Sequence, residues 1–346
     1  MIVVNGRFLS QRLTGIQRFA YEICCALQQI GVAYTILAPA DIRDDYDIDG
    51  LPVEIIGGKG SHFWEQITLP RYMKRHYDGQ ILLSLSGLSP LCYRRTILTI
   101  HDVSYLLKPR AYSRLYCWYY RLMTPLAAKR ACKILTVSRF SKAEIMHYMG
   151  VQEDKIAVVY NAVRPSSLLP REKAERYLLA VGSLMPRKNI KRLLEAYCSV
   201  EQPDFDLYIV GGMHAMYADA ELSAYADRKG VRFLGYVSTD ELMRLYRNAT
   251  AYINPSLYEG FGIPLVEAMT QECPLVVSDI PVFHEVCGDA AVYFNPMDIR
   301  DIQSKMDQIM HDASLRQQCI AAGKQQVKCF SWEQSALTIE HVITEL

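Results

Sequence analysis

A chain of 346 residues that is 50% hydrophobic and 22% charged can bury a large core, but it exceeds the size at which one core keeps growing, so we expect two domains. The ten cysteines form no CxxC pair and follow no regular spacing, which argues against a disulfide framework and a zinc site; they read as buried thiols of a reducing compartment. No apolar run reaches the roughly 18 residues of a membrane helix, and the first residues, MIVVNGRFL, lack a signal-peptide pattern. We expect a cytoplasmic protein.

Charge divides unevenly along the chain. Residues 1–164 contain 21 Lys and Arg against 13 Asp and Glu, a net charge of +8, whereas the remainder contains 17 against 24, a net charge of −7. The first part should therefore attract anionic partners. No nucleic-acid motif accompanies this charge, so we expect no nucleic-acid partner, and an anionic membrane or a phosphorylated lipid fits the surface equally well.

The first half alternates short apolar runs with helical patterns. A helix is predicted over residues 16–30, and strands are predicted over residues 2–4, 33–37, 53–56, 81–84, 96–100, 133–137 and 156–159. Helical patterns separate most of these strands, which predicts a parallel sheet covered on both faces.

The alternation restarts after a polar segment rich in proline, serine and charge. We assign residues 1–164 to the first domain, 165–176 to a linker and 177–330 to the second domain. Strands are predicted over residues 177–181, 207–210, 231–234, 251–254 and 275–277, with helices between them. The predicted fold class is α/β, with two doubly wound Rossmann-like domains facing a central cleft, where open α/β sheets bind ligands.

The segment NPSLYEGFGIPLVEAM, residues 254–269, passes from a strand through a glycine-containing turn into a helix beginning near Pro264. Gly260 and Gly262 allow a ligand to approach the backbone closely, and the first N–H groups of the helix favour an anion. Glu259 and Glu267 are spaced as E-x7-E. An isolated pair with this spacing is most often two solvated glutamates.

Other polar residues follow predicted strands. Arg187 and Lys188 come after the strand that ends near Gly182, and His101 and Asp102 follow the strand over residues 96–100. By themselves, two adjacent cations fit an ordinary surface and a lone histidine fits a structural role. At the end of a parallel strand, both pairs should reach the cleft.

With these motifs in place, the sequence resembles the retaining GT-B glycosyltransferases of family GT4, and the resemblance covers nearly the whole chain. It implies that Glu259 contacts the transferred sugar, Glu267 holds the ribose hydroxyls, and Arg187 and Lys188 neutralise the donor diphosphate. The implied catalytic residues are His101, Asp102, Arg187, Lys188 and Glu259. The implied donor-binding residues are Gly15, Gly182, Arg187, Lys188, Tyr236, Val237, Glu259, Gly260, Phe261, Gly262, Ile263 and Glu267.

The resemblance also implies that the first domain binds the acceptor and that the second domain binds the nucleotide-sugar donor. It implies several finer features as well. Backbone amides from Phe261 to Ile263 would bind sugar and phosphate oxygens, and Asp102 would orient the His101 imidazole or bind a hydroxyl. A helix over residues 331–346 would cross back onto the first domain. The family's glycine loop often has two glycines, where this chain has Thr14-Gly15.

An acid-free stretch extends from residue 103 to residue 143. Its cations are interleaved with aromatic residues, namely Lys108, Arg110, Arg114, Arg121, Lys129, Arg130 and Lys133 with Tyr105, Tyr112, Tyr116, Trp118, Tyr119 and Tyr120. One interpretation is an amphipathic helix with inward aromatics. The other is docking on the inner face of the cytoplasmic membrane, or binding of a lipid-pyrophosphate acceptor.

We therefore expect a retaining glycosyltransferase that moves a hexose from a nucleotide-diphosphate sugar to a hydroxyl of a glycan or lipid-linked glycan. GDP-mannose is the preferred donor, and UDP-sugars and dTDP-rhamnose stay open. The segment DDYDID, residues 44–49, has the letters of an Asp-x-Asp metal motif, but it lies in a polar loop of the first domain, far along the chain from the donor motifs. We therefore expect no cofactor and no metal. The alternatives are a GT-B nucleotide-sugar epimerase and a noncatalytic sugar-nucleotide-binding protein.

Overall fold

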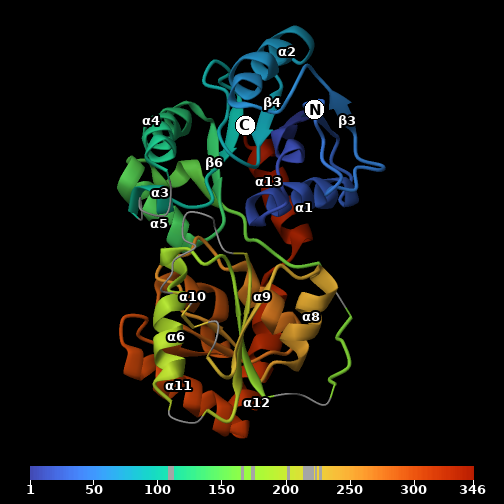
Figure 1. Ribbon diagram of the computed structural model, residues 1–346. Coiled ribbons are helices and arrows are strands. Elements are labelled where there is room, and N and C mark those ends of the chain that lie inside the picture. Colours follow the sequence, from blue (N-terminus) through green and yellow to red (C-terminus); the bar gives the residue numbers. More distant parts are fainter. Residues whose placement is uncertain are drawn as a thin grey trace. The chain divides into compact units, whose positions relative to one another are not determined.

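The computed structural model describes residues 1–107, 113–164, 167–172, 176–200, 203–212, 222, 224–225 and 228–346 (Figure 1). The chain forms two compact α/β units. Unit 1 comprises Met1–Asn161 and Ser331–Leu346, and unit 2 comprises Ala162–Phe330.

The sheet of unit 1 is parallel throughout. In the described part of this unit, seven strands pair in the order β3-β2-β1-β4-β5-β6-β7. Their bounds are β1 Ile2–Asn5, β2 Tyr34–Ala38, β3 Val53–Ile55, β4 Ile81–Ser84, β5 Thr96–Thr99, β6 Lys133–Thr136 and β7 Ile156–Val158. The strand order reverses between β1 and β4, which is where open α/β sheets leave a crevice for ligands.

The helices of unit 1 include the last helix of the chain. They are α1 Gly15–Gln29, α2 Leu69–His76, α3 Ser104–Leu107, α4 Arg114–Arg130, α5 Arg139–Met149 and α13 Trp332–Thr344, with a π-helical turn at Trp64–Thr68. Figure 1 shows α13, in red, beside α1, in blue, and the rings of Phe19 and Trp332 lie 5.9 Å apart. The Ser331 side chain caps α13 by accepting a hydrogen bond from the backbone N–H of Gln334. Because α13 buries apolar side chains against α1, residues 331–346 belong to unit 1.

Unit 2 contains a second parallel sheet. Within its described residues the strand order is β10-β9-β8-β11-β12-β13. The bounds are β8 Tyr177–Val181, β9 Asp206–Val210, β10 Val231–Gly235, β11 Ala251–Asn254, β12 Leu275–Ser278 and β13 Ala291–Phe294. Strand β13 lies at the edge of the sheet, with three of its four residues only partly buried, and it has no counterpart among the predicted strands. The order reverses between β8 and β11.

Helices cover both faces of this sheet. They are α6 Ile190–Cys198, α8 Thr239–Asn248, α9 Ile263–Thr270, α10 Pro281–Cys287, α11 Ile299–His311 and α12 Ala313–Gln326. Figure 1 shows α6 and α8 on opposite sides of the strands; α11 packs on α6, and α9 packs on α8. Both faces are therefore buried, which explains the apolar strands.

The described part of the predicted linker, residues 167–172, makes hydrogen bonds within unit 2: Glu172 N donates to Asn248 Oδ1 at 2.9 Å, and Arg171 Nε donates to the Arg247 carbonyl at 3.1 Å. One expectation needs correction. All ten cysteines are free, but three are exposed, so the expectation of buried thiols is wrong for Cys92, Cys132 and Cys329. Among the described helices, none combines the length and apolar character needed to cross a membrane.

Candidate active site

Two loops of unit 2 meet at the carboxyl edge of the sheet, where the strand order reverses. The chain leaving β8 forms a 3-10 turn, Pro186–Lys188, and the chain leaving β11 leads to Glu259. Leu257 N donates to the Arg187 carbonyl at 2.8 Å, so a backbone hydrogen bond joins the loops. The crossover point of the sheet therefore brings together residues that are about 70 positions apart.

Glu259 lies at the centre of a charged cluster. Its side chain is 9% exposed and accepts from Arg187 Nη1 at 3.0 Å, from Lys188 Nζ, and from Ser256 Oγ at 2.8 Å. Burial alone would raise the pKa of this carboxyl, but the charges of Lys188 and Arg187 and the hydrogen bonds lower the pKa to about 2. Glu259 is thus ionised at neutral pH, and the three side chains together carry one positive charge.

The turn after Glu259 leads directly into α9. Gly262 has φ 101°, and a Cβ there would lie 2.7 Å from Leu265 Cδ1, so this position requires glycine. The Phe261 ring is buried and packs edge-on against Phe330, with 5.4 Å between ring centroids. Gly260 is buried as well, and Ile263 opens the helix. The Phe261 ring is therefore not available for ligand contacts.

Glu267 lies on α9 and is almost completely buried. Its Oε2 accepts from the Tyr246 hydroxyl at 3.2 Å, and Tyr246 belongs to α8. An ionised carboxylate has about four acceptor sites, and the Tyr246 hydroxyl occupies one of them. The structure therefore holds both glutamates of the E-x7-E pattern in buried positions within unit 2.

Glycines line the neighbouring strand ends. A Cβ on Gly211 would lie 1.9 Å from the Gly182 carbonyl oxygen, and a Cβ on Gly212 would lie 2.0 Å from the Tyr236 ring. The Tyr236 side chain is 70% exposed, next to the half-buried Val237. Gly211 and Gly212 are candidate site residues that sequence reasoning missed, although a Gly-Gly pair directly after a predicted strand could have indicated them.

His101 and Gly15 lie in unit 1. His101 Nε2 is 3.0 Å from the Leu85 carbonyl oxygen, and its ring meets Phe19 of α1 edge-on at 5.0 Å. Burial lowers the pKa of His101, so the ring is neutral with a proton on Nε2 and an acceptor at Nδ1. Gly15 is the exposed first residue of the same α1 helix.

Asp102 contacts the start of the next helix, and its role toward His101 or a substrate hydroxyl stays a prediction. Asp102 Oδ1 accepts from Ser104 N at 2.9 Å and from Ser104 Oγ at 2.7 Å, which caps the short helix α3. The Leu85 carbonyl orients the imidazole. Asp side chains often accept hydrogen bonds from the residue two positions later, and Ser104 is two residues after Asp102.

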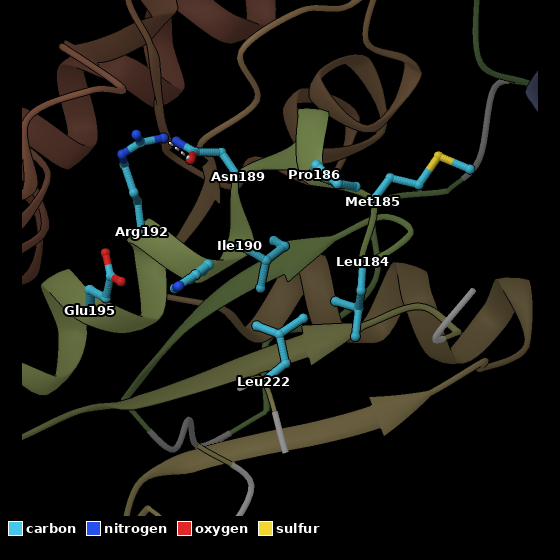
Figure 2. Close-up of a pocket in the computed structure, with 9 residues that line it drawn as sticks. Leu184, Met185, Pro186, Asn189, Ile190, Arg192, Glu195 and Leu222 are labelled. Carbon is cyan, nitrogen blue, oxygen red and sulfur yellow. Dashed lines mark hydrogen bonds between the residues drawn. The ribbon is translucent and has the colours of Figure 1, made fainter. Parts of the chain in front are cut away.

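A cavity of about 330 Å³ lies beside the 3-10 turn. Figure 2 shows Leu184, Ile190 and Leu222 pointing toward one another and Arg192 hydrogen-bonded to Asn189. Glu259 does not contribute to its lining. Across the described ranges, no three His, Cys, Asp or Glu side chains form a group that could hold a metal ion.

The acid-free stretch is partly described. Lys108, Arg110 and Tyr112 lie outside the described residues. The rings of Tyr105, Tyr119 and Tyr120 pack against the core of unit 1, as the amphipathic-helix interpretation predicts. On the outer side of α4, four apolar side chains are 41–75% exposed at helical spacing, namely Leu115, Trp118, Leu122 and Leu126. Exposed cations accompany them: Arg114, Arg121, Lys129 and Arg130.

The chain is similar to known glycosyltransferases. The sequence matches the Glycosyltransferase Family 4 model over residues 13–167 and the Glycosyl transferases group 1 model over residues 167–326. It is 38% identical to an O-antigen chain mannosyltransferase of Salmonella typhimurium, with 89% of this chain and 90% of that protein covered. It is 34% identical to O-antigen chain mannosyltransferase B of Escherichia coli, with 75% and 72% covered. Sucrose-phosphate synthase from Thermosynechococcus elongatus shares the fold at 16% identity, with a TM-score of 0.76 and 99% and 98% covered.

Proposed function

Because this chain belongs to the family 4 glycosyltransferases and has the GT-B fold, we propose that it transfers mannose from GDP-mannose with retention of anomeric configuration. The proposed acceptor is a hydroxyl of a glycan or of a lipid-pyrophosphate-linked glycan. The mannosyltransferase names of the two relatives support the choice of sugar. The observation that carries the proposal is the cluster of Arg187, Lys188 and Glu259 at the carboxyl edge of the unit 2 sheet.

The cluster suits a leaving diphosphate. Breaking the bond between the sugar and the diphosphate leaves negative charge on phosphate oxygen, and fixed cations stabilise that charge as it develops. Glu259 holds the side chains of Arg187 and Lys188 in place beforehand, which limits reorganisation during the reaction. When the donor binds, the diphosphate shares these cations, and Glu259 can accept hydrogen bonds from sugar hydroxyls.

Retention follows from the same arrangement. Glu259 is engaged by two cations and by Ser256, so it is a weak nucleophile, and we do not assign it a covalent role. A diphosphate oxygen instead accepts the proton of the attacking hydroxyl on the face from which it departs. The new bond then forms on that face. We assign the unprotonated Nδ1 of His101 as an acceptor for a substrate hydroxyl.

The reaction is proposed to need no divalent metal, because protein cations supply positive charge at the diphosphate. The test is to incubate the enzyme with GDP-mannose, UDP-sugars or dTDP-rhamnose and a lipid-linked glycan acceptor, with EDTA present. NMR of the product reports the anomeric linkage, and nucleoside-diphosphate release reports turnover. Inverted product, or activity abolished by EDTA and restored by magnesium, contradicts this mechanism. Release without any acceptor product contradicts transfer.

We also propose that unit 1 docks on anionic membranes through α4. The exposed apolar side chains supply insertion into the headgroup region, and Arg114, Arg121 and Lys129 supply attraction to anionic lipids. This surface would bring the enzyme to a lipid-linked acceptor.

A further inference from the structure

A row of three buried aromatic rings in unit 1 ends at His101. The centroid of the Trp332 ring, on α13, lies 5.9 Å from that of the Phe19 ring, on α1, and the Phe19 centroid lies 5.0 Å from that of the His101 imidazole. The ring planes are inclined by 63° and 89°, close to the edge-to-face arrangement that aromatic rings prefer. Trp332 is 8% exposed and Phe19 is 0% exposed. The start of the last helix is thus connected to His101 through one intervening ring.

The contact with Leu85 alone does not fix the His101 imidazole. The Leu85 carbonyl oxygen lies 3.0 Å from Nε2, and the Ser141 hydroxyl donates to the His101 carbonyl at 3.1 Å, which holds the backbone. The torsion that turns a histidine ring about its bond to Cβ has broad minima, so one hydrogen bond leaves the ring freedom to turn. The perpendicular Phe19 ring limits that rotation. The direction of Nδ1 therefore depends on Phe19.

Trp332 is held in place by hydrogen bonds on both sides of it along the chain. The Ser331 side chain caps α13, and Ser335 Oγ donates to the Tyr160 carbonyl at 2.7 Å. The cap fixes where the helix begins, and the bond to Tyr160 ties its first turn to the chain after β7. The Trp332 side chain is therefore a firm neighbour for the Phe19 ring.

Helix packing alone does not explain the indole of Trp332. Its Nε1 atom is buried and has no hydrogen-bond acceptor among the described residues. A buried indole N–H usually has a partner, and a donor that loses water without gaining one costs stability. A purely apolar side chain would avoid this cost. The large ring instead supplies the contact between α13 and Phe19.

We propose that Phe19 and Trp332 are positioning residues that hold the His101 imidazole in one orientation for the reaction. Phe19 acts on the imidazole directly, and Trp332 acts through Phe19. Neither side chain touches the substrate in this assignment, and together they keep Nδ1 directed at the substrate hydroxyl. The use of Nδ1 rests on the proposed glycosyltransferase function, whereas the fixed orientation of the ring does not.

NMR of protein labelled with 15N-histidine tests the orientation without any substrate. The His101 signals are identified with His101→Gln, and they report which ring nitrogen carries the proton. We expect wild type to show one tautomer, protonated on Nε2. Phe19→Leu and Trp332→Leu replace a ring by an apolar chain and should show both tautomers, because an imidazole that turns away from Leu85 carries the proton on either nitrogen. Trp332→Phe keeps a ring and removes the unpaired N–H, so it should keep the wild-type signals.

The matched controls are Leu27→Ala on α1 and Ile339→Ala on α13. Both residues are 0% exposed, and they lie about two turns along their helices from Phe19 and Trp332. The controls should unfold at lower urea concentration than wild type and leave the His101 signals unchanged. Wild-type signals in both leucine variants, or the same change in the controls, overturns the positioning role.

Activity separates this role from the proposed function. Where transfer is measured, Phe19→Leu and Trp332→Leu should lower kcat by about tenfold or more, and the controls and Trp332→Phe should keep a kcat close to that of wild type. A mixture of tautomers with unchanged kcat overturns the positioning role in the reaction. If the spectra follow the expected pattern but wild type transfers no sugar, the fixed orientation of His101 stands and the proposed function fails.

Discussion

At the scale of single residues, the negative charge of Glu259 contributes to the free energy of unfolding of unit 2. Its folded pKa of about 2 lies below the ordinary value of 4.5, so its contribution to stability is present above pH 4.5 and is lost as the pH falls through 2. We expect Glu259→Gln to reduce the free energy of unfolding at pH 6 by up to about 3 kcal/mol. The difference from wild type should shrink toward pH 2. Urea unfolding at a series of pH values measures it.

The matched control for this prediction is Glu153→Gln, which removes an exposed carboxylate 3.3 Å from Lys142. Its effect should stay within about 1 kcal/mol at every pH. A Glu259→Gln deficit that is the same at pH 6 and pH 2.5 would show that the carboxylate charge does not stabilise the cluster.

Glu267 is the residue assigned to the ribose. Glu267→Ala should weaken binding of the nucleoside diphosphate by roughly 1 to 3 kcal/mol, because ribose hydroxyls lose a charged acceptor. Tyr246→Phe removes only the hydroxyl that donates to Glu267, so its effect should be smaller. Calorimetry with GDP, UDP and dTDP measures both variants. Unchanged affinity in Glu267→Ala rules out the ribose assignment.

At the scale of elements, the ends of β8 and β9 approach so closely that only glycine fits between them. Gly211→Ala would place Cβ 1.9 Å from the Gly182 carbonyl oxygen, a backbone atom that cannot rotate away. Gly235→Ala, at the end of β10, has a positive φ of 67° and nothing within 4 Å of the new methyl. We expect Gly235→Ala to cost about 1 to 2 kcal/mol and Gly211→Ala a further 1 to 3 kcal/mol. Urea unfolding compares them, and equal costs would contradict the close approach.

Some strands and helices can be predicted from the sequence, and others cannot. Strands β1, β4, β8 and β11 are predicted because both faces of each sheet are covered, which leaves continuous apolar runs. Strand β13, an edge strand that is only partly buried, is not among the predicted strands. Helix α9 is predicted from Gly262 and Pro264, since a left-handed glycine and a proline in the first turn are local signals.

For the whole molecule, the charge asymmetry and the outer side of α4 together predict membrane binding. The variant Arg114→Gln/Arg121→Gln/Lys129→Gln should lose most cosedimentation with anionic liposomes, because each cation near the surface contributes about 1 kcal/mol. Trp118→Ser/Leu122→Ser should lose it as well, by removing exposed apolar area. The control Lys229→Gln/Arg300→Gln/Lys328→Gln neutralises exposed cations of unit 2 and should bind like wild type. Binding that resists high salt, or that the α4 variants retain, contradicts docking through α4.

The sequence by itself determined the two α/β units, their parallel sheets and the candidate residues near the E-x7-E pattern, because these depend on local periodicity and on motifs of neighbouring residues. Only the tertiary structure decided which of those residues meet. It pairs Glu259 with Arg187 and Lys188, joins Asp102 Oδ1 to Ser104, and exposes one side of α4. It also joins Arg7 to Glu65, which are 58 positions apart, at the crossover of the unit 1 sheet. Such contacts depend on strand order and on the packing of distant segments, and spacing along the chain contains neither.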